Sequence, residues 1–140
     1  MPELMTADAV RDLAGSVAEA RSLGHSLVTP THVLLSVASH RSPARGLLDA
    51  AGADHGAVRA ALAARRPAGA SSGRPRELPW SPEMERILHL SQSLTEKPFS
   101  SAHLLGLILD NDGECVALLE GCGVATAELR AAVATELGRA

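Results

Sequence analysis

Aromatic side chains are almost absent from this chain of 140 residues. It has no tyrosine, one tryptophan and one phenylalanine, so aromatics make up 1 % of the residues, whereas hydrophobic residues make up 46 %. A buried core must therefore be built from Leu, Val, Ile and many Ala residues. Alanine has the highest helix propensity of the amino acids. The composition thus favours helices that approach one another closely through small side chains.

Lysine is nearly missing as well, and neither sign of charge dominates. Lys97 is the only lysine, the other basic residues are arginines, and the formal net charge is −3. A protein that binds nucleic acid through phosphates needs a cluster of basic residues to displace counterions. The sequence has no such cluster, so we expect no nucleic-acid partner.

Signals for export or membrane insertion are also lacking. The N-terminus, MPELMTADAV, has no basic region followed by an apolar one. No apolar run approaches the roughly 18–20 residues of a membrane-spanning helix. We expect a cytoplasmic protein without a membrane partner. Its two cysteines, Cys115 and Cys122, are then expected to be free, buried thiols with a packing role.

The motifs of common enzymes and cofactor sites do not occur. A P-loop needs Gly-Lys-Ser/Thr, but Lys97 lies between Glu96 and Pro98. There is no dinucleotide-binding fingerprint, no Cys-x-x-Cys pair and no nucleophile elbow. The stretch DNDGE at 110–114 lacks the glutamate that a calcium loop carries at its twelfth position, so it is interpreted as a turn. We expect no enzymatic activity and no cofactor.

The histidines do not have the spacing of a metal site. None of the six forms the i, i+4 pair that zinc sites on helices use. His32 and His103 each precede a Leu-rich run, which suggests that each imidazole forms a local hydrogen bond that organises a helix start. We therefore predict no metal site. The histidines are at positions 25, 32, 40, 55, 89 and 103.

What the chain does contain is a duplication. Residues 58–63 read VRAALA and residues 129–134 read LRAAVA, 71 positions later. The same offset aligns His32 with His103 and Gly52 with Gly123, and an offset of 75 aligns Thr6 with Ser81 further upstream. A repeat of about 65 residues would bury too little surface to be stable alone. Two copies are therefore expected to share one core.

Each copy contains start and stop signals for four helices. We predict an all-α fold of eight helices, arranged as two pseudo-symmetric four-helix repeats in a single domain, residues 1–140. Repeat one spans 3–65, a linker rich in Pro, Gly and Ser spans 66–79, and repeat two spans 80–137. Helix starts are expected at Thr6, Thr29, Ser42, Asp54, Ser81, Ser100 and Glu114. Helix ends are expected near Ala51, Arg65, Leu94, Leu109, Gly121 and Leu137.

The duplicated pattern resembles a known family. The stretches AEARSLGHSLVTPTHVLLSV, LLDAAGA and LPWSPEMERILHLS are similar to the Clp N-terminal domain, the double-repeat helical module that precedes the ATPase rings of ClpC-type unfoldases. The resemblance covers about residues 3–137. It implies a binding module that docks adaptor proteins and substrates. Because no ring follows Ala140, the chain is expected to be either an excised domain or a free-standing relative, and the start at Met1 without a tag favours the second.

One property of the family is not expected here. In the relatives that resemble this chain most, a Glu before the His of each repeat is associated with recognition of phosphorylated arginine. The equivalent positions are Thr31 and Ala102, which cannot pair with a guanidinium as a carboxylate does. The second repeat also has LTEKPF in place of the Leu-Gly-His loop. We therefore regard the phosphoarginine positions as lost.

A second property of the family implies a ligand surface. Related domains carry a hydrophobic surface where the N-terminus meets the start of repeat two, and in some bacteria cyclic peptide antibiotics attach there. The single Trp80 stands at this place, either as a plug that closes the seam between the repeats or as an exposed anchor for a peptide. By position, the surface should include Pro2, Met5, Ala14, Pro79, Trp80, Glu85, Leu88 and His89.

Two functions are compatible with these features. The first is a non-enzymatic decoy that binds cyclic peptide antibiotics aimed at the N-domain of an unfoldase and so sequesters them. The second is an accessory or adaptor subunit that docks on the ATPase or protease ring and modulates substrate delivery. The first predicts binding through Trp80, and the second predicts binding to the Clp machine through another surface.

Overall fold

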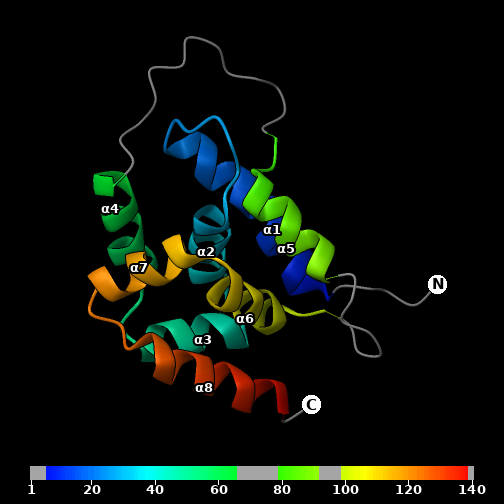
Figure 1. Ribbon diagram of the computed structural model, residues 1–140, viewed down its shortest axis with the longest axis vertical. Coiled ribbons are helices and arrows are strands. Elements are labelled where there is room, and N and C mark those ends of the chain that lie inside the picture. Colours follow the sequence, from blue (N-terminus) through cyan, green and yellow to red (C-terminus); the bar gives the residue numbers. More distant parts are fainter. Residues whose placement is uncertain (1–5, 66–78, 92–98, 139–140) are drawn as a thin grey trace, which may run out of the picture.

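The computed structural model describes residues 6–65, 79–91 and 99–138. These residues form eight helices and no strands, which confirms the predicted fold class (Figure 1). Repeat one comprises α1 (Ala7–Ser22), α2 (Pro30–Ser39), α3 (Pro43–Ala50) and α4 (His55–Arg65). Repeat two comprises α5 (Pro82–Ser91), α6 (Ser101–Asn111), α7 (Gly113–Gly121) and α8 (Thr126–Gly138).

The helix boundaries follow local signals that the two repeats share. Ser42 and Asp112 cap α3 and α7 by accepting hydrogen bonds from backbone N–H groups three residues later. After the same two helices the chain turns at Gly52 and Gly123, both with φ near +85°, a conformation that side chains disfavour. The DNDG stretch is a helix connection, as predicted. Its turn is tighter than expected, because only Asp112 separates α6 from α7.

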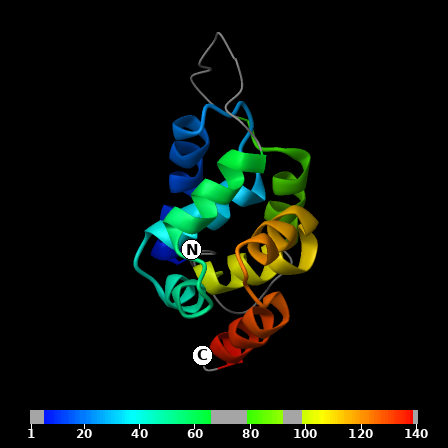
Figure 2. The same ribbon diagram turned by 90° about the vertical axis from the view of Figure 1, so that its left-hand side faces the viewer.

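The fourth helix of each repeat contacts both repeats. In each repeat, the fourth helix packs on the second helix of its own half and on the third helix of the other half. Thus α4 lies against α2 and α7, whereas α8 lies against α6 and α3 (Figures 1 and 2). The central helices α2 and α6 also pack on each other. Neither half therefore encloses its core by itself.

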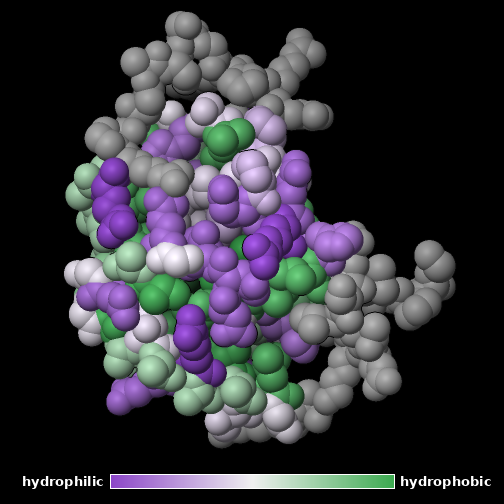
Figure 3. Space-filling model, in the orientation of Figure 1, coloured by the Kyte–Doolittle hydropathy of each residue, from purple (hydrophilic) through white to green (hydrophobic). Residues whose placement is uncertain are grey.

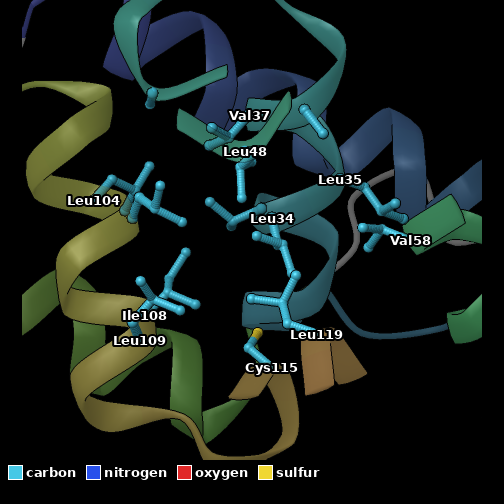
Figure 4. Close-up of a cluster of buried hydrophobic side chains, with 14 of the residues drawn as sticks. Leu34, Leu35, Val37, Leu48, Val58, Leu104, Ile108, Leu109, Cys115 and Leu119 are labelled. Atoms are coloured by element: carbon cyan, nitrogen blue, oxygen red, sulfur yellow. The ribbon is translucent and has the colours of Figure 1, made fainter. Parts of the chain in front are cut away.

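The shared core is aliphatic. Leu34 and Leu48 from repeat one face Leu104 and Ile108 from repeat two, and Cys115 from α7 closes one side (Figure 4). All five are at most 1 % exposed. At about 25 cal/mol per Å² of apolar surface removed from water, a cluster of this kind is the main source of stability. Because its members come from both repeats, the core forms only when both are folded.

Two backbone pairings join the repeats at equivalent positions. The Thr6 N–H donates to the Phe99 carbonyl at 2.9 Å, and the Ser81 N–H donates to the Val28 carbonyl at 2.9 Å. Under the duplication, Thr6 corresponds to Ser81 and Val28 corresponds to Phe99. Each repeat therefore begins by pairing with the segment that precedes the second helix of the other. This reciprocity places the start of repeat two, including Trp80, beside repeat one.

One close helix contact breaks the symmetry. A methyl group added at Gly15 of α1 would come within 2.4 Å of the Ser36 hydroxyl in α2 and 2.8 Å of the ring of His40, which directly follows α2. Glycine therefore allows α1 to approach α2. The equivalent position in repeat two is Leu90, so this approach is specific to repeat one.

Some expectations fall outside the described residues or need correction. Residues 66–78 of the proposed linker, and the expected end of a helix near Leu94, lie outside the described ranges. Both cysteines are free, but only Cys115 is buried; Cys122 follows the end of α7 and is half-exposed. Within the part of the chain that the structure describes, no helix is long and apolar enough to cross a membrane.

Candidate functional site

Two short extended segments meet at the seam between the repeats. Residues 27–29 and 79–81, which we call the Trp80 clip, form a parallel bridge between Val28 and Trp80. The Val28 N–H donates to the Pro79 carbonyl, and the Ser81 N–H donates to the Val28 carbonyl, both at 2.9 Å. Two hydrogen bonds thus fix the backbone on either side of Trp80.

The clip residues differ in exposure. Trp80 is half-buried and packs against the core, which is compatible with a plug at the seam and with an anchor for a peptide. Beside it, Pro79 is exposed, and Leu27 is 41 % exposed, one of two large hydrophobic residues that the described surface leaves open. The clip therefore presents apolar side chains on a fixed backbone.

A chain of two imidazoles supports the clip from inside. The Thr29 N–H donates to His32 Nδ1 at 2.9 Å, so in the neutral ring the proton of His32 lies on Nε2. That Nε2 is 2.8 Å from His25 Nδ1, which must accept. Because His32 is fully buried in α2, its hydrogen bonds to Thr29 and His25 hold residues 25–29 against this helix.

The second repeat keeps one half of this arrangement. The Ser100 N–H donates to His103 Nδ1 at 3.0 Å, which confirms that both equivalent histidines organise a helix start. His103 stacks on Phe99, with ring centroids 5.6 Å apart, whereas the equivalent His32 contacts His25. In this capping role Nδ1 accepts a proton and Nε2 carries one, so neither neutral ring offers a free nitrogen to a metal. Among the described residues, no three metal-ligating side chains gather.

The structure brings together only part of the predicted ligand surface. Pro79 and Trp80 share the clip, whereas Pro2 and Met5 lie outside the described residues. Ala14 is exposed on α1, Glu85 and His89 are exposed on α5, and Leu88 is half-buried against the core. The helices α1 and α5 overlap in Figure 1 but are separated in Figure 2, and both pack on α6. The described residues of the predicted surface therefore come from three segments: the clip, α1 and α5.

The surface on this side of the molecule is chemically mixed. Figure 3 shows hydrophilic and hydrophobic side chains interspersed over the described residues, with hydrophobic ones gathered in small groups. A ligand held here would rely on a few anchors more than on broad apolar burial. Trp80 and Leu27 are the anchors that the clip supplies.

Thr31 and Ala102, the two positions at which the family resemblance implied a lost phosphoarginine site, are both buried. Thr31 is fully buried, and its hydroxyl lies 2.6 Å from the Thr29 hydroxyl. Ala102 is 6 % exposed at the start of α6. Neither position presents a carboxylate or an accessible polar group.

Sequence reasoning missed a buried polar cluster at Asp12. This carboxylate of α1 is fully buried; it accepts from the Ser101 hydroxyl at 2.5 Å and from His40 Nδ1 at 3.1 Å. Burial raises the pKa of Asp12, against the lowering effects of the Ser101 hydrogen bond, His40 and Arg11. The signal was available in the alignment of the repeats, because Asp12 corresponds to the apolar Ile87.

The Asp12 cluster has the residue types of a hydrolase triad but not its geometry. A triad histidine contacts its carboxylate through one ring nitrogen and its serine through the other. Here Asp12, the Ser36 carbonyl and the Ser36 hydroxyl all lie around the same atom, His40 Nδ1. The cluster therefore joins α1 to α2 and α6 and does not activate a hydroxyl.

Cys122 is another titratable group with a shifted pKa. Burial, followed by the charge of Asp54, raises the pKa of its thiol. The thiolate is the nucleophilic form of cysteine, so this environment holds Cys122 in its unreactive form. Its sulfur lies 3.8 Å from the Ala57 carbonyl, which links α7 to α4.

Comparison with known proteins agrees with this architecture. The family model of the Clp repeat N-terminal domain matches residues 4–103. The N-terminal domain of the caseinolytic protease associated chaperone ClpD from Arabidopsis thaliana is similar, with a TM-score of 0.78 and 24 % identity over 96 % of this chain and 97 % of that one. The Hsp104 N-terminal domain from Candida albicans has a TM-score of 0.75 and 15 % identity, over 94 % of this chain and 89 % of that one. At these identities the structural likeness concerns the fold alone. No curated protein matches the chain.

Proposed function

Because this chain belongs to the family of Clp repeat N-terminal domains, we propose that it is a non-enzymatic peptide-binding module that acts as a decoy for cyclic peptides. The domains of this family in unfoldases bind substrates and adaptors. A decoy would take up peptides that otherwise occupy the N-domain of such an unfoldase. The peptide would be sequestered and not transformed.

The half-buried Trp80 on its clip is the observation that carries this proposal. A tryptophan brings a large flat apolar area to an interface at a small cost in side-chain entropy. The residues on either side of it, Pro79 and Ser81, are hydrogen-bonded to Val28, so little further ordering is required when a ligand binds. Leu27 and Pro79 of the clip are also exposed.

A decoy works by mass action. When its concentration is well above its dissociation constant for the peptide, free peptide falls in proportion to the amount of decoy present. Protection should therefore be stoichiometric and saturable, with one peptide removed for each chain. Turnover of the peptide is not part of the proposal.

Substitution of Trp80 tests the proposal. With an aromatic, head-to-tail cyclic heptapeptide as the probe, Trp80→Ala should weaken binding by about 2–3 kcal/mol, because the main apolar anchor is lost. Trp80→Phe is the matched variant and should retain most of the affinity. Titration calorimetry measures both, and circular dichroism checks that each variant is folded. Unchanged affinity in Trp80→Ala would refute binding through this surface.

The role as an accessory subunit makes a different prediction. In a pull-down from native lysate, such a subunit would retain Clp ATPase or protease components without any cyclic peptide, and Trp80→Ala would not release them. A decoy is not expected to bind the Clp ATPase or the protease through Trp80. If a Clp ring were recovered equally with and without the peptide, and equally by the wild type and by Trp80→Ala, that result would contradict the decoy and support the accessory role.

A further inference from the structure

We infer that the Trp80 clip binds its ligand by pairing main chain with main chain: an extended peptide adds to the outer edge of Trp80. This inference rests on the proposed function and specifies how the peptide is held. The occupant is a polypeptide segment in extended conformation, with free amide groups and at least one apolar side chain.

The register of the clip leaves one edge open. In the parallel bridge, Val28 uses both its N–H and its C=O, and their partners are the Pro79 carbonyl and the Ser81 N–H. In such a ladder, the residue opposite directs its own N–H and C=O to the other side. The amide groups of Trp80 therefore point away from Val28.

Among the described residues, no group takes up this edge. Within the described part of the chain, neither the N–H nor the C=O of Trp80 has a hydrogen-bond partner. The helix that follows does not use the carbonyl, since the Met84 N–H is capped by the Ser81 hydroxyl. Backbone polar groups are almost always paired, with protein, water or ligand. A donor and an acceptor one residue wide are thus available to a partner.

The surroundings of this edge suit an extended peptide. A strand that adds to an edge gains affinity from main-chain hydrogen bonds and specificity from its alternate side chains. The partly exposed Trp80 offers an apolar contact for one such side chain. The His25–His32 pair holds residues 25–29 in place before binding, which reduces the ordering required.

Backbone N-methylation of a probe peptide tests the inference. The probe is acetyl-Ser-Val-Phe-Val-Ser-amide, together with three analogues that are each N-methylated at one of the central residues. Trp80 offers a single carbonyl acceptor, so only one of the three methylations should weaken binding, by about tenfold for one lost hydrogen bond. The other two methylations should leave the affinity within about twofold. Chemical-shift titration of the ¹⁵N-labelled protein measures the dissociation constants.

The protein side gives an independent signal. In the free protein, the amide of Trp80 should exchange with solvent faster than those of Val28 and Ser81, which are hydrogen-bonded. Saturating parent peptide should slow exchange at Trp80, and the analogue that binds tenfold more weakly should restore it at equal occupancy.

Each alternative has its own outcome. Equal affinity of all analogues, with a shift of the indole but not of the Trp80 amide, would overturn edge pairing while leaving peptide binding at Trp80 intact. Concentration-dependent dimerisation that the peptide does not compete with would assign the edge to a second copy of the chain. If neither this probe nor the cyclic heptapeptide binds, both the inference and the proposed function fail.

Discussion

At the scale of single residues, Asp12 is the most constrained group in the molecule. Its carboxylate is fully buried in the contact of α1 with α2 and α6, and it joins the repeats through Ser101. Burial raises its pKa, so the folded protein binds a proton at Asp12 more readily than the unfolded chain does. The contribution of Asp12 to stability must then fall with rising pH over the range in which Asp12 ionises.

The Asp12→Asn variant isolates this effect. The contribution of Asp12 is fully present below its unfolded pKa, about 3.9, and is lost as the pH rises through the higher pKa of the folded state. The free energy of unfolding of the wild type, minus that of Asp12→Asn, should therefore be largest near pH 3 and decrease above about pH 4. Urea denaturation monitored by Trp80 fluorescence measures both proteins. A difference that grows with pH would show instead that His40 and Ser101 outweigh the cost of burial.

Gly15 is constrained by space. Gly15→Ala should lower the free energy of unfolding by about 1–3 kcal/mol, because the new methyl group would collide with Ser36 and His40. Gly46→Ala is the matched control: Gly46 lies inside α3 with nothing within 4 Å of an added methyl, so the variant should be more stable by about 0.5–1 kcal/mol. Thermal unfolding compares the two. If Gly15→Ala raised the free energy of unfolding as Gly46→Ala does, α1 would be able to move away from α2 at little cost.

At the scale of elements, the helices were predictable because their signals are local. Thr6, Ser42 and Ser100 cap helices where the sequence indicated, and the equivalent glycines 52 and 123 end α3 and α7. The Val28–Trp80 bridge was not predictable, because it joins segments about fifty residues apart and neither alternates like a strand. For the same reason, His25 and Leu27 were interpreted only as part of a helix break. Trp80 and Pro79 were identified through the family resemblance, not through any local pattern.

The two histidine caps should differ in energetic weight. His32 is fully buried and bonded to both Thr29 and His25, so His32→Ala would leave a cavity and two groups without partners. His103 is half-exposed and would lose its cap and its stack on Phe99. We expect a loss of about 2–4 kcal/mol for His32→Ala and about 1–2 kcal/mol for His103→Ala. Chemical denaturation measures both, and equal losses would contradict a special role for the repeat-one loop.

At the scale of the whole molecule, the repeats depend on each other. The fourth helix of each packs on the third helix of the other, and the core draws on both. Fragments 1–66 and 67–140 should therefore be largely unfolded when separate. Mixed in equal amounts, they should recover helical circular dichroism and the native emission of Trp80. A cooperative unfolding transition in either fragment alone would contradict this interdependence.

The packing of each repeat on the other within one chain also bears on how such a protein can evolve. Two identical chains related by a twofold axis must carry the same residue on both sides of that axis. Once the halves are fused into one polypeptide, each copy is free to diverge. The repeats differ at two aligned positions: Gly15 corresponds to Leu90, and Asp12 corresponds to Ile87. A homodimer could not carry such a difference on one side only. The imidazole pair and the buried carboxylate are thus specialisations available only to a covalently joined duplicate.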